Sequence, residues 1–240
     1  MLLSTLGLGF LIGMQHASEA DHVAAVASMA SGRKGLRSIT RHGVFWGIGH
    51  TATLLLVAGG CLILRLTIPD GLSGALEFLV GVMLVGLGAH VLRRLWRERA
   101  HFHVHQHAED APAHLHLHSH GKEGVPHQVS THDHAHAEPL PWRTLAVGLM
   151  HGMAGSAALI VLTAASLESP WIGLAYVLLF GLGTIIGMGV LSLIIAAPIT
   201  FTARMMTVSN TGLQIAIGCL TIAIGLHTLM ETGPGVWATF

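Results

Sequence analysis

The sequence predicts an all-α integral membrane protein with six transmembrane helices, arranged as two inverted three-helix repeats joined by a His-rich cytoplasmic loop. Three observations lead to this prediction. Of the 240 residues, 52% are hydrophobic and only 10% are charged, whereas a soluble domain carries roughly 25% charged residues. Six apolar stretches are each long enough to cross a bilayer, which takes about 20 helical residues. The two halves of the chain also match each other, helix by helix.

The six predicted spans divide the chain into three parts. The first repeat occupies residues 1–97, a polar segment fills residues 98–141, and the second repeat occupies residues 142–240. Twelve of the nineteen histidines lie in the polar segment, which we expect to be a loop. The spans are expected near Leu2–Ala30, Val44–Leu66, Leu72–Leu92, Leu145–Ser166, Trp171–Ile199 and Gly212–Leu229.

The repeat is predicted from gapless matches at nearly constant spacing. Gly13 and His16 fall on Gly148 and His151, which lie 135 residues further along the chain. The second and fifth spans match at an offset of 134 residues, and the third and sixth at 137. Chance matching of glycine-rich apolar helices is the alternative, and three near-equal offsets speak against it. Three spans are an odd number, so the second copy must run in the opposite direction, as in transporters whose substrate site lies near the bilayer midplane.

Basic residues in the loops predict the orientation in the membrane. Eleven of the twelve Lys and Arg residues fall on the side of the polar segment, and only Arg65 falls on the other side. Basic loops remain in the cytoplasm, so we expect both termini outside and the His-rich loop inside. The expected location is the cytoplasmic membrane, with the lipid bilayer around the spans. The formal charge of zero gives no indication of a nucleic-acid partner.

Ionisable residues interrupt the first predicted span at "HASEADH", residues 16–22. His16, Glu19 and His22 would form one stripe on a regular helix, whereas Asp21 would point to another side. All four converge only if the helix is unwound there, as helices at transporter sites are, and glycines at positions 7, 9 and 13 permit such irregularity. Each ionisable side chain in a span costs about 3 kcal/mol, so such residues mark an ion path or pair with one another.

Histidines of other spans extend this group into a candidate metal site. The second span contributes His50 and the fourth contributes His151. Imidazole nitrogen and carboxylate oxygen suit a first-row divalent metal such as nickel, cobalt, zinc or copper, whereas calcium and magnesium prefer oxygen. The metal is expected as cargo, and no cofactor is expected. The predicted metal residues are His16, Glu19, Asp21, His22, His50 and His151.

A structural role is the alternative for each of these side chains. A cluster of histidines and carboxylates can fix helix packing or relay protons. His90 and His227 lie near the ends of their spans and are expected to be packing residues, and His42 is expected to be interfacial. The stretches "HFHVHQH", "HLHLHSH" and "HDHAHAE" in the polar segment are typical of a metal-binding tract that could buffer, deliver or sense metal.

Two motifs resemble signatures of the nickel/cobalt transporter family. "HASEADH" is similar to H-A-x-D-A-D-H, with Glu19 where that family usually has Asp, and "FWGIGHTATLL" is similar to its second signature. The later signature L-G-F-D-T-A-T-E is absent and the chain is shorter than eight-span members, so it resembles a compact six-span branch with His-rich loops. This resemblance implies a secondary permease for nickel or cobalt, with His16, Asp21, His22 and His50 on the metal path.

We therefore expect a transporter of nickel or cobalt ions and not an enzyme. Uptake is favoured because the two motifs match importers, and no ATP-binding signature occurs, so ion gradients, the membrane potential or a partner subunit must supply the energy. An efflux permease whose loop detects excess metal is one alternative. A non-transporting metal-binding scaffold for metalloenzyme maturation is another. A metal-dependent hydrolase is the third, although no G-x-S-x-G motif occurs. The sequence identifies no partner protein.

Overall fold

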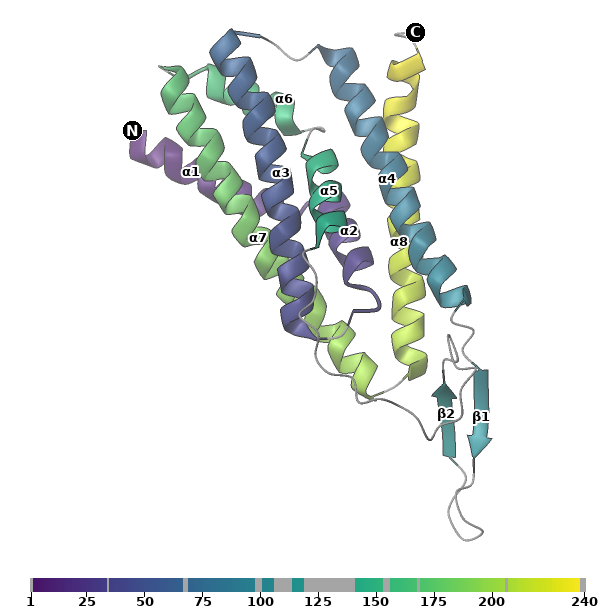
Figure 1. Ribbon diagram of the computed structural model, residues 1–240. Coiled ribbons are helices and arrows are strands. Elements are labelled where there is room, and N and C mark those ends of the chain that lie inside the picture. The colour runs from purple at the N-terminus through teal and green to yellow at the C-terminus, as the bar shows by residue number, and fades with distance from the viewer. Residues whose placement is uncertain are drawn as a thin grey trace.

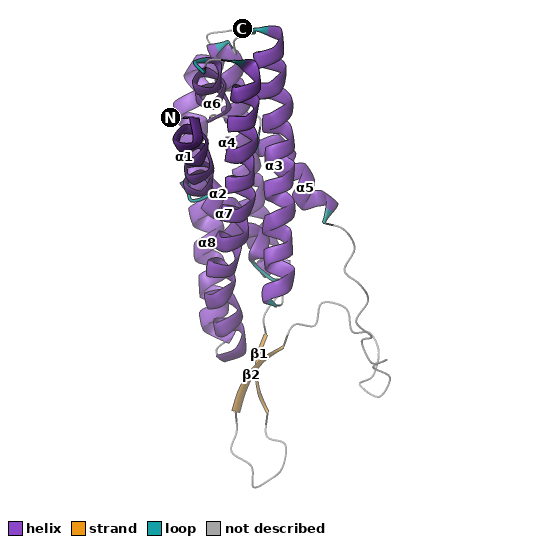
Figure 2. Ribbon diagram, turned by 90° about the vertical axis from the view of Figure 1, so that its left-hand side faces the viewer, coloured by secondary structure: helices purple, strands orange, loops and turns teal. Residues whose placement is uncertain are grey.

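The computed structural model describes residues 2–33, 35–66, 69–97, 101–105, 114–118, 141–152, 156–167, 169–205 and 207–237, and it shows a helical bundle with a two-stranded sheet beyond one end (Figures 1 and 2). The elements are, in chain order, α1 (Leu2–His16), α2 (Ala20–Ala30), α3 (Leu36–Leu64), α4 (Asp70–Arg97), β1 (His101–His105), β2 (His114–His118), α5 (Trp142–His151), α6 (Ser156–Ala165), α7 (Pro170–Met205) and α8 (Thr207–Trp237). The start of α1 and the end of α8 lie toward the end of the bundle opposite the sheet (Figure 1).

Within the described residues, four helices are long and apolar enough to cross a membrane: α3, α4, α7 and α8. Their mean hydropathy lies between 1.8 and 2.4. Large apolar side chains such as Leu56 and Met230 are mostly exposed on their outer faces, which favours contact with lipid rather than water. The chain is therefore an α-helical membrane protein.

The first and fourth predicted spans each consist of two helices, and in the first the interruption falls within "HASEADH", where convergence of the four ionisable residues requires an unwound helix. Residues 17–19 separate α1 from α2, and the chain beyond His151 separates α5 from α6. These helices have 15, 11, 10 and 10 residues. At about 1.5 Å per residue, none of them alone crosses a hydrocarbon core of about 30 Å. Apolar composition does not distinguish one long helix from two short ones that meet inside the protein.

The polar segment contains a short antiparallel sheet and is not entirely loop. In this sheet His101 of β1 pairs with His118 of β2, and His105 pairs with His114. The alternation in "HFHVH" and "HLHLH" is the period-two pattern of a strand, so the sequence did contain this signal. The third His-rich stretch, "HDHAHAE", lies outside the described residues.

Glycines allow two pairs of helices to approach closely in a similar way. α1 packs against α7, and α5 packs against α3. A Cβ atom at Gly13 would collide with the carbonyl oxygen of Phe180, and one at Gly148 would collide with the carbonyl oxygen of Trp46. Small residues of this kind are what close helix packing in a membrane requires.

α4 and α8 form another close pair, which runs along one side of the bundle (Figure 1). A Cβ atom at Gly81 would lie 3.0 Å from the carbonyl oxygen of Gly225, and one at Gly225 would lie 2.8 Å from that of Gly81. Gly88 and Gly218 face each other in the same manner. The pair contacts the other helices through α2 and α7.

An apolar core lies beside the break between α1 and α2. Ala25, Trp46, Leu84 and Met188 are completely buried and belong to one cluster, which joins α2, α3, α4 and α7. This cluster fixes the position of α2, which begins at the break. The position of the short helix therefore depends on tertiary packing more than on its own length.

Candidate metal centre

The break between α1 and α2 consists of three residues, Ala17 to Glu19. The amide of Glu19 bonds to the carbonyl oxygen of His16 at 3.1 Å, three residues back instead of four, and this tighter bond ends α1. Glu19 then adopts an extended conformation, with φ −63° and ψ 150°, as the N-cap residue of α2. Carboxylates are stabilised near a helix N-terminus, so Glu19 and Asp21 favour a new helix start at this point.

The glycines of α1 do not form the break. A Cβ atom at Gly9 would lie 2.7 Å from the ring of Tyr176, and one at Gly13 would meet the backbone of Phe180, whereas one at Gly7 would have no neighbour within 4 Å. Gly9 and Gly13 therefore serve helix packing against α7. The break lies after His16, among the ionisable residues of "HASEADH".

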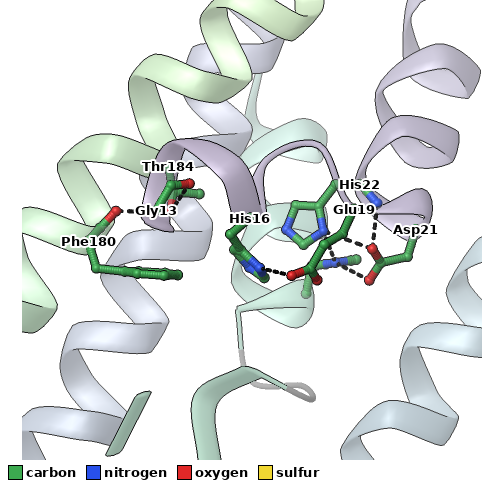
Figure 3. A network of polar contacts seen from close by, with 8 residues as sticks. Gly13, His16, Glu19, Asp21, His22, Phe180 and Thr184 are labelled. Carbon is green, nitrogen blue, oxygen red and sulfur yellow. Dashed lines mark hydrogen bonds and ion pairs between the residues drawn. The ribbon is translucent and has the colours of Figure 1, made fainter. Parts of the chain in front are cut away.

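Asp21 links histidines from two different helices. Its Oδ1 lies 3.0 Å from His22 Nδ1 and accepts a hydrogen bond from the His22 amide at 2.8 Å (Figure 3). Its Oδ2 lies 3.1 Å from Nε2 of His151, the last residue of α5. The two imidazoles also approach each other, with His151 Nε2 3.2 Å from His22 Nδ1. The carboxylate thus joins the start of α2 to the end of α5.

His16 and Glu19 form a second pair across the break (Figure 3). The distance between His16 Nδ1 and Glu19 Oε1 is 2.8 Å. The His16 side chain is 4% exposed and that of Glu19 is 54% exposed, so Glu19 extends from the buried imidazole toward the surface. The ring of His16 lies 4.4 Å from that of His22 and 5.3 Å from that of Phe180, measured between centroids.

His50 of α3 completes the group of imidazoles. Its ring centroid lies 5.2 Å from those of both His16 and His22. Among the described residues, neither ring nitrogen of His50 has a hydrogen-bond partner, and the same holds for His22 Nε2 and His151 Nδ1. Buried polar atoms in proteins are almost always hydrogen-bonded. Four buried nitrogens without partners in one place therefore mark a position where a ligand could satisfy them.

The possible metal-binding atoms fall into two overlapping sets within the described residues. His16, His22 and His50 form one set, and Asp21, His22 and His151 form the other. In each set the ligand atoms lie within 4.8 Å of one another. The structure thus brings all six residues singled out in the sequence into one region, although Glu19 belongs to neither set. That these residues bind metal remains a prediction.

The ends of three helices meet at this group. α1 ends at His16, α5 ends at His151, and α2 begins at Ala20. The carbonyl groups at a helix C-terminus carry partial negative charge, which favours a cation nearby. The carboxylates of Glu19 and Asp21 offset the opposite charge at the start of α2. The electrostatic environment therefore favours a cation over an anion.

Aromatic rings enclose part of the group. Trp46 is completely buried, and its ring lies 5.3 Å from that of His22 and 5.2 Å from that of His151. Trp46 on the side of α3 and Phe180 on the side of α7 thereby limit the access of water to the histidines. The remaining side borders a cavity.

The cavity has a volume of about 370 Å³ and lies between the histidine group and the pair α4 and α8. Glu77 of α4 borders this cavity and was not among the predicted site residues, although an acidic residue in an apolar span is a recognisable signal. His227, expected to be a packing residue, has a side chain that is 70% exposed and borders this cavity. The lining residues are His16, Glu19, Ala20, Asp21, His22, His50, Glu77, Val80, His151, Ile224, His227 and Thr228.

Comparison with known proteins gives three similar sequences. The chain is 37% identical over 234 residues to the urease accessory protein UreH of Bacillus sp. (strain TB-90), covering 97% of this chain and 93% of that protein. It is 28% and 27% identical to the chloroplast proteins FOR GROWTH AND FERTILITY 1 and 2 of Arabidopsis thaliana, over 78% of this chain in each case. The chain spans about half the length of these two proteins, 48% and 46%. No family model and no solved structure matches.

The first of these similarities bears on two predictions. It supports the nickel/cobalt transporter type of family that the two motifs indicate. The similar protein is described as an accessory protein, which agrees with the expectation that this chain is not an enzyme.

Proposed function

We propose that this chain, which belongs to the family of the urease accessory protein UreH, is a secondary transporter that takes up nickel or cobalt ions across the cytoplasmic membrane. The observation that carries the proposal is the set of buried ring nitrogens of His22, His50 and His151 that lack hydrogen-bond partners among the described residues. These three histidines border a cavity, and the other ring nitrogens of His22 and His151 contact the Asp21 carboxylate.

The arrangement of ligands suits passage of an ion better than permanent storage. His22 belongs to both ligand sets, one with His16 and His50 and the other with Asp21 and His151. A dication can thus exchange ligands stepwise between neighbouring positions without becoming fully uncoordinated. Conduction needs binding that is strong enough for the ion to enter the site. The binding must also be spread over several neighbouring positions, so that the ion can leave. Imidazole with carboxylate favours a first-row transition metal over calcium or magnesium.

The six-span layout with two inverted repeats is part of this proposal. α1 with α2, and α5 with α6, would each act as one broken span. The reciprocal glycine contacts support it, because Gly13 of α1 packs on α7 as Gly148 of α5 packs on α3. The contact of Gly81 with Gly225 likewise mirrors that of Gly218 with Gly88. In this layout both termini and the cavity bordered by Glu77 face outward, and the His-rich segment faces the cytoplasm.

The membrane potential supplies enough energy for uptake. Moving a dication inward through a potential that is negative inside releases roughly 4.6 kcal/mol per 100 mV, twice the value for one charge. No hydrolysis of ATP is then required.

The test is flux of nickel and cobalt into liposomes that contain the purified protein, under an imposed potential. Asp21→Asn and His50→Ala should abolish flux, because each removes donors from the buried group. His42→Ala is the matched control, since His42 also lies on α3 but bonds Thr144 at 2.6 Å and does not line the cavity. Removal of residues 101–136 should leave flux intact. Flux that survives both site substitutions would refute the proposal.

A scaffold that supplies metal for enzyme maturation is the second candidate. It is favoured by the description of the similar Bacillus protein as a urease accessory protein. In that case no variant would move metal across the membrane. Removal of residues 101–136 would then eliminate most metal binding, and Asp21→Asn would have little effect. The same set of variants therefore separates the two functions.

A further inference from the structure

The cavity beside the histidine group extends to ionisable residues of α4 and α8. We infer that Glu77 and His227 form an outer station that captures a hydrated transition-metal dication before it reaches His16, His22 and His50. The inference rests on the proposed function, since it concerns the access route to the same site.

The close contact of α4 with α8 brings these two residues to one level of the bundle. Gly81, one helical turn after Glu77, packs against Gly225, which lies two residues before His227. Both side chains border the same cavity as the buried imidazoles. His50 borders it too, is 1% exposed and has two ring nitrogens without partners among the described residues. The route from Glu77 and His227 thus ends at buried ring nitrogens that have no hydrogen-bond partner among the described residues and could bind the metal.

The chemistry at the station is that of a loose, cation-attracting site. Glu231 lies 3.7 Å from His227 Nδ1 but is mostly exposed and does not line the cavity, whereas Glu77 does. Glu77 and His227 belong to neither of the tight ligand sets found among the described residues. A dication would therefore bind there through its water shell and lose water later, at the buried imidazoles.

A second cavity shows the opposite charge. It has a volume of about 500 Å³, and Arg33, Arg94 and Arg143 are among its lining residues. The cavity bordered by Glu77 and His227 is lined by neither Lys nor Arg among the described residues. Clefts lined by one sign of charge concentrate ions of the other sign and raise association rates. A dication is thus attracted to the first cavity and repelled from the second.

The rate at which nickel reaches the histidine group tests this inference. Nickel near His22 and His151 should quench the fluorescence of Trp46, whose ring contacts both, and the part of the signal lost in Trp46→Phe identifies this site. Stopped-flow mixing of the detergent-solubilised full chain with nickel chloride gives the association rate constant. Glu77→Gln is expected to lower it about fivefold at low salt, with convergence toward wild type at high salt, where exposed charges are screened.

Two further variants sharpen the result. His227→Asn should also slow association, because it removes an imidazole that borders the cavity along the route to the buried histidines. Glu231→Gln removes the same charge as Glu77→Gln from a residue that does not line the cavity, so its effect should be clearly smaller. Unchanged amplitude of quenching at saturating nickel shows that the inner site is intact in each variant.

Two outcomes would overturn the proposed outer station. In the first, Glu77→Gln and His227→Asn bind nickel with the wild-type association rate constant. In the second, Glu231→Gln lowers this rate constant as much as Glu77→Gln does. Either result leaves the proposed function standing if the wild-type chain moves nickel into liposomes. Conversely, quenching without flux in liposomes refutes transport, while the rate comparison still decides whether Glu77 and His227 capture the ion.

Discussion

The two broken helices of this protein share a backbone plan and differ in charge. α1 and α5 each carry a glycine that packs on a long helix, Gly13 on α7 and Gly148 on α3, and each ends three residues later at a histidine. After His16 the sequence continues with Glu19, Asp21 and His22, whereas after His151 it continues as "GMAGSAA" without a charge. Helix packing is thus similar in both halves, and most of the ionisable side chains of the site come from one.

The long helices show the same asymmetry. At the position of α7 that matches His50 of α3 at the offset of 134 residues stands Thr184. Its hydroxyl donates to the carbonyl oxygens of Gly13 at 3.2 Å and Phe180 at 3.0 Å. One half therefore presents an imidazole to the site, and the other uses a hydroxyl to hold α1 against α7.

The largest expected effect is on nickel affinity, and it should differ between His151 at the end of α5 and His16 at the end of α1. His151→Ala removes one ligand of the set with Asp21 and His22, and it also removes the contacts by which His151 positions the other two residues of that set, so we expect nickel affinity to fall about 100-fold. His16→Ala should lower it about tenfold, since the donors that remain include Asp21, His22 and His151. Isothermal titration calorimetry in micelles measures both. Equal losses would mean that the two halves contribute equally to binding.

The next largest effect should come from substitutions at the two glycines that pack α1 on α7 and α5 on α3. Gly13→Ala and Gly148→Ala each place a methyl group against a backbone carbonyl, and we expect the free energy of unfolding to fall by about 2 kcal/mol. Gly7→Ala is the matched control on α1, because no atom lies within 4 Å of its Cβ position. Denaturant titration in micelles measures these values. If only one of the two variants is destabilised, the packing is not equivalent in the two halves.

The smallest effect should come from removing the hydroxyl of Thr184, the residue that matches His50 in the other half of the chain. Thr184→Val removes a hydrogen bond between α7 and α1, which in membrane proteins contributes about 0.6 kcal/mol, and it should leave nickel affinity unchanged. Thr53→Val serves as the control, because the Thr53 hydroxyl bonds to Gly49 of its own helix. Unfolding and calorimetry on the same samples check both expectations. A loss of nickel affinity in Thr184→Val would place this residue in the site.

Which residues come together in this region was easier to predict from sequence than the backbone that holds them. His16, Asp21 and His22 stand out because ionisable groups are rare in apolar spans, whatever the local fold. The boundaries of α1 and α2 could not be predicted, because hydropathy is the same for one helix and for two. Asp21, near the start of α2, pairs with His151, which is more than a hundred residues away in the chain.

Other features required the tertiary structure. Glu77 lies near the start of a span, where a carboxylate is commonly interfacial, and only the packing of α4 on α8 brings it to the cavity. The strands at His101–His105 and His114–His118 had a visible alternation, but its histidines matched a metal-binding tract equally well. The six-span topology stays a prediction, because four described helices meet the length and hydropathy of a span.

The pairing of α4 with α8 also constrains how the protein is made. More than a hundred residues separate the two helices in the chain. During synthesis α4 is therefore in the membrane before α8 has been made. Until then one wall of the cavity is missing, and Asp21 and its histidines face lipid or the insertion machinery. Completion of the polar site is therefore a late step of biogenesis, and a chain stalled before α8 would expose its most polar surface to the bilayer.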